Sequence, residues 1–553
     1  MEQRSPSFIY RLKLFTSSAS LVASLPLLTA ALLCVCLTTE SGAGLCLVAL
    51  VPFAYVLVKQ NVPRATYAST YLAGLAVHLV GMAWVLDCYR YENVVGPYAV
   101  QWFWIGTWGG FLLVSALAIG RIISTRWRLP ATVLLPMLWV AYEFIRHEMA
   151  DFATGTGFPW LKLGTSLADN RYFVQIADLG GEYLLSFLVA MINGALVDLA
   201  LLLVFTQKRT KQPGRIAATM VSTLTVLLAL GYGDWRASQS PGVEGPTVVL
   251  MGELDLPPLL PAARIRAATG DRHADLLLWP ELAYHHSIFD IDHDAKVESD
   301  SHNAITPVSL VHDIADNQAR RYLQQSAKEL GSTLVIGCKR IHVTREGSCN
   351  FNSLACVDPL EGYQGCYDKV NLVPGAEATM RSAELFDASK FAYSRGHELN
   401  IFRLPSKTAT YRFAPAICYD LCFGKHFRSV STQKVDFLVQ SGAEGQDDSG
   451  KISWLMLRYA RIRAIENRRA LVRNATLGHS ALIDSNGVVR AILTTEPITS
   501  PTWLGAVPID TRWSLYSRCG DWVAYVACLA TLGLVVPVSR RPRLGYRFAK
   551  RSL

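Results

Sequence analysis

Long apolar runs separated by short polar loops dominate the first 235 residues, and one more such run follows residue 520. A helix needs about 20 mostly apolar residues to cross the hydrocarbon core of a bilayer. One such run could be a buried helix of a soluble protein, but eight in one chain predict a membrane protein. The predicted spans are 19–37, 44–58, 67–86, 97–120, 130–146, 182–206, 216–233 and 521–538.

Basic residues mark one side of these spans. They gather in alternate loops, and lysine and arginine in short loops favour the cytoplasmic side. Both chain ends are therefore predicted to be cytoplasmic, with residues 234–520 outside. The first run is interpreted as a retained signal-anchor, because no small-residue cleavage site follows Leu37. The basic residues are Arg4, Arg11, Lys13, Lys59, Arg64, Arg121, Arg126, Arg128, Lys208, Arg209, Lys211 and Arg215, and in the tail Arg540, Arg541, Arg543, Arg547, Lys550 and Arg551.

The composition supports this interpretation. The 553 residues are 51% hydrophobic and 18% charged, which excludes a disordered chain. Much of the net charge of +9 lies in the basic loops, so it reflects topology, and no nucleic-acid partner is predicted. We expect three regions: a membrane domain at 1–233 with about seven helices, an extramembrane domain at 234–520, and a last helix with a basic tail at 521–553.

The segment 234–520 has a different pattern. Short β-branched or apolar runs are separated by polar turns, and helical patterns stand at 315–330 and 453–469. Strands that alternate with helices predict an α/β domain. The turn sequence at 484–487 predicts a reversal between two strands. The predicted strands are 247–251, 274–279, 333–338, 353–357, 413–418, 435–440, 470–474 and 479–484.

Three residues at or near predicted strand ends are candidates for chemistry. Glu281 follows an apolar run that ends at a proline, and strand ends are where α/β sheets place their sites. Lys369 stands in a mostly apolar stretch and could stabilise an oxyanion. Cys418 ends another apolar run, where a strand-to-helix turn would favour the thiolate. Taken singly, a surface glutamate, a solvated lysine and an inert buried cysteine are the more ordinary interpretations.

Together, in the order Glu281, Lys369, Cys418 and with their flanking residues, they resemble the nitrilase superfamily. That resemblance implies a Glu–Lys–Cys triad on a four-layer α-β-β-α sandwich. The spans before and after the domain make the chain similar to the bacterial apolipoprotein N-acyltransferase family. Further similar segments are 139–146, 157–161, 181–187 and 518–522, together with Glu377, which follows the lysine segment.

The resemblance implies acyl transfer in the bacterial inner membrane, with the catalytic domain on the periplasmic side. Cys418 would take an acyl chain from a phospholipid as a thioester and pass it to the N-terminal amine of a diacylglyceryl-cysteine lipoprotein. Glu281 would act as general base and acid, and Lys369 would stabilise the oxyanion. Substrate positioning would fall to Glu377, Tyr419 and Asp420. This chemistry needs neither a cofactor nor a metal.

The chain also departs from the family pattern. Residues 251–258 and 439–445 differ from the sequence motifs usual at these places in the family, and Asp420 stands where the family usually has glutamate. Two alternatives stay open: a membrane-anchored amidohydrolase that uses water as acceptor, and a non-catalytic member that binds lipids or lipoproteins. Retention of the triad residue types and the number of spans favour the acyltransferase.

Histidines and further cysteines are weaker candidates. The spacing of His285, His286, His302 and His312 does not match a metal site. Cys338, Cys349, Cys356 and Cys366 could form one or two disulfides in an oxidising compartment. A solvated face is the favoured interpretation of the arginines on the 453–469 helix.

Overall fold

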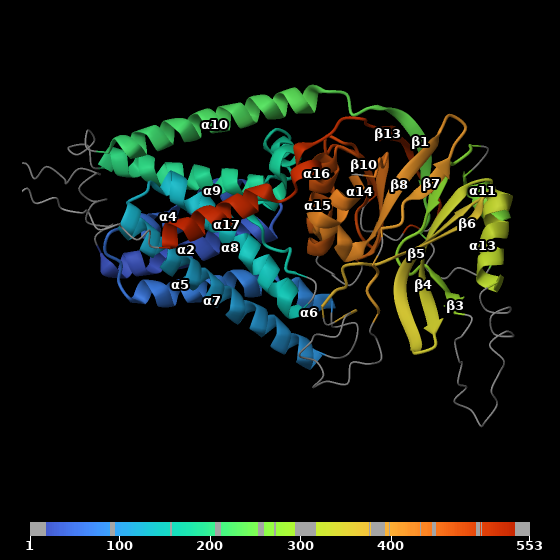
Figure 1. The fold of residues 1–553 in the computed structure, drawn as a ribbon, viewed down its shortest axis with the longest axis horizontal. Coiled ribbons are helices and arrows are strands. Elements are labelled where there is room, and N and C mark those ends of the chain that lie inside the picture. Colours follow the sequence, from blue (N-terminus) through green and yellow to red (C-terminus); the bar gives the residue numbers. More distant parts are fainter. Residues whose placement is uncertain are drawn as a thin grey trace, which may run out of the picture.

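A helical bundle forms one end of the molecule, and an α/β domain forms the other (Figure 1). The computed structural model describes residues 18–88, 95–154, 157–204, 212–252, 259–269, 272–292, 317–374, 376–377, 393–397, 399–431, 433–444, 450–493, 498 and 500–536. Outside these ranges lie His302, His312, residues 253–258, and the basic residues predicted at 4–13, 208–211 and 540–551.

Where the structure describes them, all the predicted spans correspond to helical structure. Among the described residues, four helices could cross a membrane by length and composition: Ala19–Thr38, Ala99–Trp127, Phe173–Val204 and Pro213–Ser238. The apolar helices Ala43–Val58 and Trp522–Val535 are shorter, so crossing by the remaining predicted spans stays a prediction. The bundle consists of α2 (Ala19–Thr38), α3 (Cys46–Ala49), α4 (Val51–Val58), α5 (Ala65–Gly81), α6 (Trp84–Cys88), α7 (Val95–Trp127), α8 (Ala131–Thr154), α9 (Ala177–Val204), α10 (Pro213–Ser238) and α17 (Trp522–Val535).

Basic helix ends meet at the end of the bundle that faces away from the α/β domain (Figure 1). The Arg121 guanidinium donates to the carbonyls of Lys59 and Gln60, just after α4. At the end of α7, Trp127 Nε1 donates to the Leu534 carbonyl near the end of α17 at 2.9 Å. These contacts place the C-terminal ends of α4, α7 and α17 on one side of the bundle, as the alternation of basic loops predicts.

The α/β domain contains two sheets. Among the described residues, one sheet has the order β13-β1-β2-β4-β5-β6, with β3 paired to β4, and the other has the order β12-β11-β10-β9-β8-β7. The first sheet comprises β1 (Val243–Leu250), β2 (Leu276–Leu278), β3 (Tyr284–Ile291), β4 (Thr333–Thr344), β5 (Gly347–Asp358), β6 (Gly362–Asp368) and β13 (Thr502–Ile509). The second comprises β7 (Phe402–Pro405), β8 (Thr410–Ile417), β9 (Phe437–Ala443), β10 (Ala470–Thr476), β11 (Ser480–Ile483) and β12 (Val489–Leu493).

The layers follow the predicted helix–sheet–sheet–helix order. Apolar faces of the two sheets form one core between them, with Leu276 and Leu354 from the first sheet and Phe413 and Val439 from the second. Helices α11 (Ala262–Thr269) and α13 (Asn317–Leu330) cover the outer face of the first sheet, and α14 (Gly424–Ser431) and α15 (Lys451–Asn467) cover the second (Figure 1).

The eight predicted strands all coincide with strands, and both helical patterns form helices. The predicted reversal lies between β11 and β12, where the Asp484 carboxylate accepts from the Asn486 and Val488 N–H groups at 2.9 and 3.0 Å. The prediction missed β3, β6, β7 and β13, and it implied β12 only through the turn before it, without giving its range. Strand β6 contains Gly362 and Gly365, both with positive φ, so its local sequence resembles a turn more than a strand.

Helix α15 joins the domain to the bundle, so the predicted solvated arginine face is wrong. Arg458 binds Asp169, Arg463 binds Glu182 at 3.2 Å, and the adjacent Arg468 binds Asp178 at 2.7 Å. The three guanidinium groups are buried. One continuous apolar core extends from the bundle through α15 to the outer face of the second sheet.

A bend in α9 makes this junction possible. Gly181 has φ of 68°, and a side chain there would meet Tyr516 at 2.4 Å. The bend releases the Glu182 N–H from the helical hydrogen-bond pattern, and it donates to the Glu466 carboxylate on α15 at 3.0 Å. Bundle and domain are therefore held by buried polar contacts as well as by apolar packing.

Candidate active site

Glu281 stands just beyond β2 in the first sheet and points toward the second. Its Oε2 accepts from the Ala443 N–H at the end of β9, at 2.9 Å, and its Oε1 accepts from Asn352 Nδ2 at 2.6 Å. Only 6% of the residue is exposed. Burial raises the pKa of Glu281, and the ammonium of Lys369 opposes this shift.

Lys369 follows β6 and lies between two carboxylates. Its Nζ is 3.1 Å from Glu281 Oε1 and 2.8 Å from Glu377 Oε1. Burial alone would lower the pKa of Lys369, but the charges of Glu281 and Glu377 outweigh it and raise the pKa. The ammonium is therefore permanently charged at neutral pH.

Cys418 occupies the sharp turn between β8 and a five-residue 3₁₀ helix, Cys418–Cys422. Its φ is 47°, a strained value for a residue with a side chain, and such strain is concentrated at functional sites. Burial and the charge of Glu281 raise the pKa of the thiol, although Lys369 opposes them. This direction of shift favours the protonated thiol at rest, whereas the sequence interpretation expected a helix N-terminus to favour the thiolate. A base has to remove the thiol proton during attack.

Asn352 was missed by the sequence interpretation. Its Nδ2 donates to Glu281 at 2.6 Å and to Glu377 at 3.0 Å, so it holds the two carboxylates at a fixed separation. The Glu377 Oε2 is bound in turn by the Val373 N–H at 2.9 Å. The local sequence Asn350-Phe351-Asn352-Ser353 is largely polar, so it offered no distinct signal for this residue.

Asp420 makes contacts with the backbone beside Cys418, and its predicted role in positioning substrate stays a prediction. Its Oδ2 accepts from the Tyr367 hydroxyl at 2.7 Å and from the Ile417 N–H at 3.0 Å. Its Oδ1 accepts from both the backbone and the side chain of Asn371, each at 2.8 Å. The carboxylate thus ties the backbone before Cys418 to the segment that follows Lys369.

Tyr419 turns toward the bundle. Its ring lies 5.5 Å from that of Trp160 and 4.9 Å from that of Phe423, measured between centroids. Trp160 belongs to the segment 157–161 that the sequence interpretation singled out. Tyr419, which directly follows Cys418, therefore contacts the helical bundle.

The departure at 439–445 introduces a buried ion pair beside the site. Glu444 binds Arg473, and burial raises the pKa of this glutamate. Within the described residues no group of three or more His, Cys, Asp or Glu side chains could hold a metal ion. The described cysteines are all free thiols, so the disulfides considered for Cys338, Cys349, Cys356 and Cys366 do not form in this structure.

Comparisons with known proteins match both parts of the chain. A family model for the apolipoprotein N-acyltransferase N-terminal domain matches residues 29–195, and one for carbon-nitrogen hydrolases matches residues 248–507. The second match includes Glu281, Lys369 and Cys418.

Relatives match over most of the chain and over most of their own length. The apolipoprotein N-acyltransferase of Geobacter metallireducens is 24% identical, over 90% of this chain and 92% of that protein. The protein of the same name from Vibrio vulnificus is 26% identical, over 87% of this chain and 90% of its own. Among solved structures, an amidase from Nesterenkonia sp. is 19% identical and covers 52% of this chain and 99% of its own, with a TM-score of 0.34.

Proposed function

Because the chain belongs to the apolipoprotein N-acyltransferase family, we propose that it transfers an acyl chain from a membrane phospholipid to the N-terminal amine of a diacylglyceryl-cysteine lipoprotein. The observation that carries this proposal is the meeting of Glu281, Lys369 and Cys418 beside the bundle, with Tyr419 in contact with Trp160. A nucleophile in this place serves a substrate whose tails remain in the membrane.

The first half-reaction forms a thioester. Glu281 removes the thiol proton as Cys418 Sγ attacks the ester carbonyl of the phospholipid. Negative charge develops on the carbonyl oxygen, and the Lys369 ammonium stabilises it together with the backbone N–H after Cys418. The intermediate collapses as Glu281 returns the proton to the departing glycerol oxygen. The products are the acylated enzyme and a lysophospholipid.

The second half-reaction passes the acyl chain to the acceptor. The lipoprotein amine attacks the thioester carbonyl, and Glu281 takes the proton that the nitrogen loses. Collapse of this intermediate forms the amide and releases the thiolate, which recovers its proton from Glu281. The raised pKa of the thiol favours that recovery and returns the enzyme to its resting state.

We place the catalytic domain on the periplasmic side of the inner membrane. The contacts of Arg121 and Trp127 gather basic helix ends at the far end of the bundle, and such ends favour the cytoplasm. The domain then faces the compartment opposite to them.

The decisive experiment starts with purified protein and phospholipid alone. Intact-mass measurement should detect an acyl adduct on Cys418, and a diacylated lipopeptide should then remove the adduct and gain an amide-linked chain. An amidohydrolase would lose the adduct to water at the same rate with and without the lipopeptide. A binding protein without activity would never acquire the adduct.

A further inference from the structure

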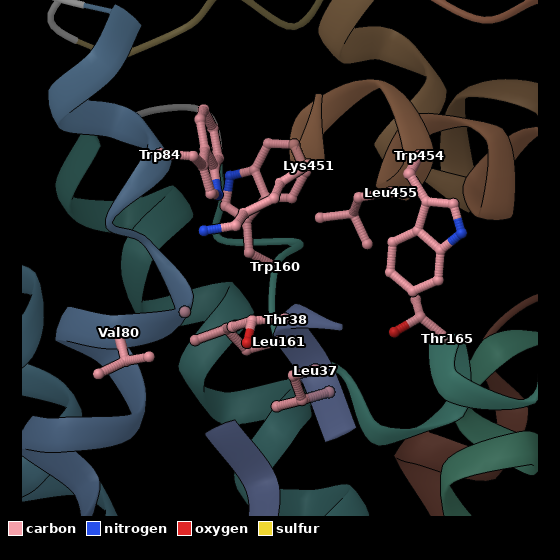
Figure 2. A pocket seen from close by; sticks show the side chains of 11 residues that line it. Leu37, Thr38, Val80, Trp84, Trp160, Leu161, Thr165, Lys451, Trp454 and Leu455 are labelled. Atoms are coloured by element: carbon pink, nitrogen blue, oxygen red, sulfur yellow. The ribbon is translucent and has the colours of Figure 1, made fainter. Parts of the chain in front are cut away.

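The triad residues are held in place by different parts of the molecule. Cys418 is followed by Tyr419, whose ring packs on Trp160. Trp160 packs in turn on Trp84 of α6, with ring centroids 5.1 Å apart (Figure 2). The nucleophile is therefore backed by the bundle. Lys369 follows β6 of the first sheet, and that sheet supplies the contacts that fix its position.

The end of an edge strand is a weak place for a catalytic side chain. β6 stands last in the strand order, so among the described residues its ladder partner is β5 alone. Asp368 is the last residue of β6, and the Lys369 N–H donates to the Asn352 carbonyl of β5 at 2.8 Å. Backbone at the ends of elements opens easily. A lysine that has to stabilise an oxyanion from this position needs further support.

The Asp368 carboxylate receives that support from the two neighbouring strands. Arg340 of β4 donates from Nε to Asp368 Oδ1 at 3.0 Å and from Nη2 to Oδ2 at 2.6 Å. To reach Asp368, the Arg340 side chain crosses β5 over the ring of Phe351, with the guanidinium carbon 4.4 Å from the ring centroid. The Ser353 hydroxyl of β5 also donates to Asp368 Oδ1, at 2.6 Å. The residue before Lys369 is thus bound by three donors.

Arg340 is itself held by a second carboxylate. Its Nη1 donates to Asp290 Oδ2 of β3 at 2.6 Å, and Arg320 of α13 binds the other oxygen of Asp290. The side chains of Arg340 and Asp368 are 15% and 17% exposed. Ion pairs that water can reach add little to folding stability, whereas a two-pronged arginine–carboxylate contact fixes direction as well as distance. This arrangement therefore serves geometry more than stability.

We propose that Arg340 is a positioning residue of the acyl-transfer reaction, which acts through Asp368 to set where the Lys369 ammonium stands relative to Cys418. The inference rests on the proposed function and deepens it by adding a residue of β4 to the groups on which thioester formation depends. The Arg340 guanidinium bonds Asp368 and Asp290 rather than the triad, so its effect on the chemistry passes through Lys369.

The test measures acylation of Cys418 in the full-length protein by the p-nitrophenyl ester of a long-chain fatty acid. This activated donor keeps slow variants measurable. Arg340→Gln should lower the maximal rate by up to about 10²-fold, the loss that a displacement of about 1 Å can cause, and should leave the half-saturating donor concentration unchanged. Asp368→Asn disrupts the same contact from the other side and should also lower the maximal rate. Arg340→Lys should lie between wild type and Arg340→Gln, since an ammonium cannot form the two-pronged contact.

A double-mutant cycle separates positioning of Lys369 from a general loss of structure. In Lys369→Met no ammonium remains to be positioned, so adding Arg340→Gln should slow acylation no further. A general loss of structure would slow both backgrounds by the same factor. Arg490→Gln is the matched control, because it breaks an arginine–aspartate pair on the edge strand β12 of the same domain, where Arg490 lies 2.5 Å from Asp484. This control should keep wild-type kinetics.

The outcomes separate this inference from the proposed function. A wild-type maximal rate in Arg340→Gln would overturn the inference, and so would an equal slowing in the wild-type and Lys369→Met backgrounds. A wild-type protein that forms the adduct with the nitrophenyl ester but never with phospholipid would overturn the proposed function instead, and the cycle between Arg340 and Lys369 could still be measured with the ester.

Discussion

Replacing Asp420 by asparagine tests whether this carboxylate positions the nucleophile or contacts the acceptor. The side chain keeps its shape, but one oxygen becomes an NH₂ group. At one oxygen that group would face the Ile417 N–H, and at the other the Asn371 N–H. In either orientation a backbone N–H inside the site is left without its acceptor.

The expected loss of unfolding free energy follows from the hydrogen bonds that this substitution breaks or weakens. An unpaired polar group inside a protein costs about 1–3 kcal/mol, and the weakened bond from the Tyr367 hydroxyl adds about 1 kcal/mol. We expect the domain to lose about 2–4 kcal/mol of unfolding free energy. Because the Ile417 N–H anchors the backbone before Cys418, thioester formation should slow by up to about 10²-fold. Asp420→Glu should not speed either step, because overpacking costs about 1–3 kcal/mol.

Two rates distinguish a role of Asp420 in positioning the nucleophile from a role in holding the acceptor amine. The first is the appearance of the thioester with phospholipid alone, and the second is its decay after a diacylated lipopeptide is added. Positioning of the nucleophile requires the first rate to fall. If the first rate stays at the wild-type value while the second falls, Asp420 holds the acceptor amine and the positioning role is refuted. Asp436→Asn is the matched control, because Asp436 accepts the Arg412 N–H at 2.7 Å at the outer end of β8.

Four other predictions concern the triad and the topology. Cys418→Ala should abolish the acyl adduct, and Cys418→Ser should nearly do so; an unchanged adduct mass in the alanine variant would place the nucleophile elsewhere. Glu281→Gln should slow thioester formation about 10²–10⁴-fold and Lys369→Met about 10²–10³-fold, and wild-type rates in both would refute the triad. Because Glu281 must be ionised and burial raises its pKa, thioester formation in the wild type should decline as pH falls through a value above 4.5. Lys369→Met should move that decline to higher pH, since the opposing charge is gone; a shift to lower pH would contradict this electrostatic account. A reporter fused at Ala237 should be exported, and a cytoplasmic signal there would overturn the orientation.

Much of the architecture could be predicted because apolar pattern and turn chemistry are local properties. Each predicted span and strand had such a signal, including the turn at 484–487. The candidate triad residues could also be singled out, since Glu281 and Cys418 follow apolar runs that become β2 and β8, one in each of the two facing sheets. Strand β6 was not predictable, because its positive-φ glycines resemble a turn and it is a strand only through pairing with β5.

The roles of polar residues depended on contacts that no local pattern reveals. Asn352 bridges two carboxylates from different segments, and Asp420 meets donors that precede it by up to 53 positions. From the sequence alone, the arginines at 453–469 resemble a solvated helix face. In the structure, Asp169, Asp178 and Glu182, which lie between α8 and α10, form ion pairs with them. The direction of the thiol pKa shift was missed for a related reason, because the sequence does not show that Glu281 comes to lie beside a partly buried Cys418.

The core that α15 shares with the bundle has a consequence for how the protein is made in the cell. Translation produces α2 through α10 first, so those helices can enter the membrane before the domain exists. The outer face of α15 then finds its apolar and ionic partners already assembled, and α17 packs last against Val140 of α8 and Tyr183 of α9. Residues 234–520 released alone would expose that unmatched face to water. We therefore expect the severed domain to aggregate, and co-expression with the bundle to recover it.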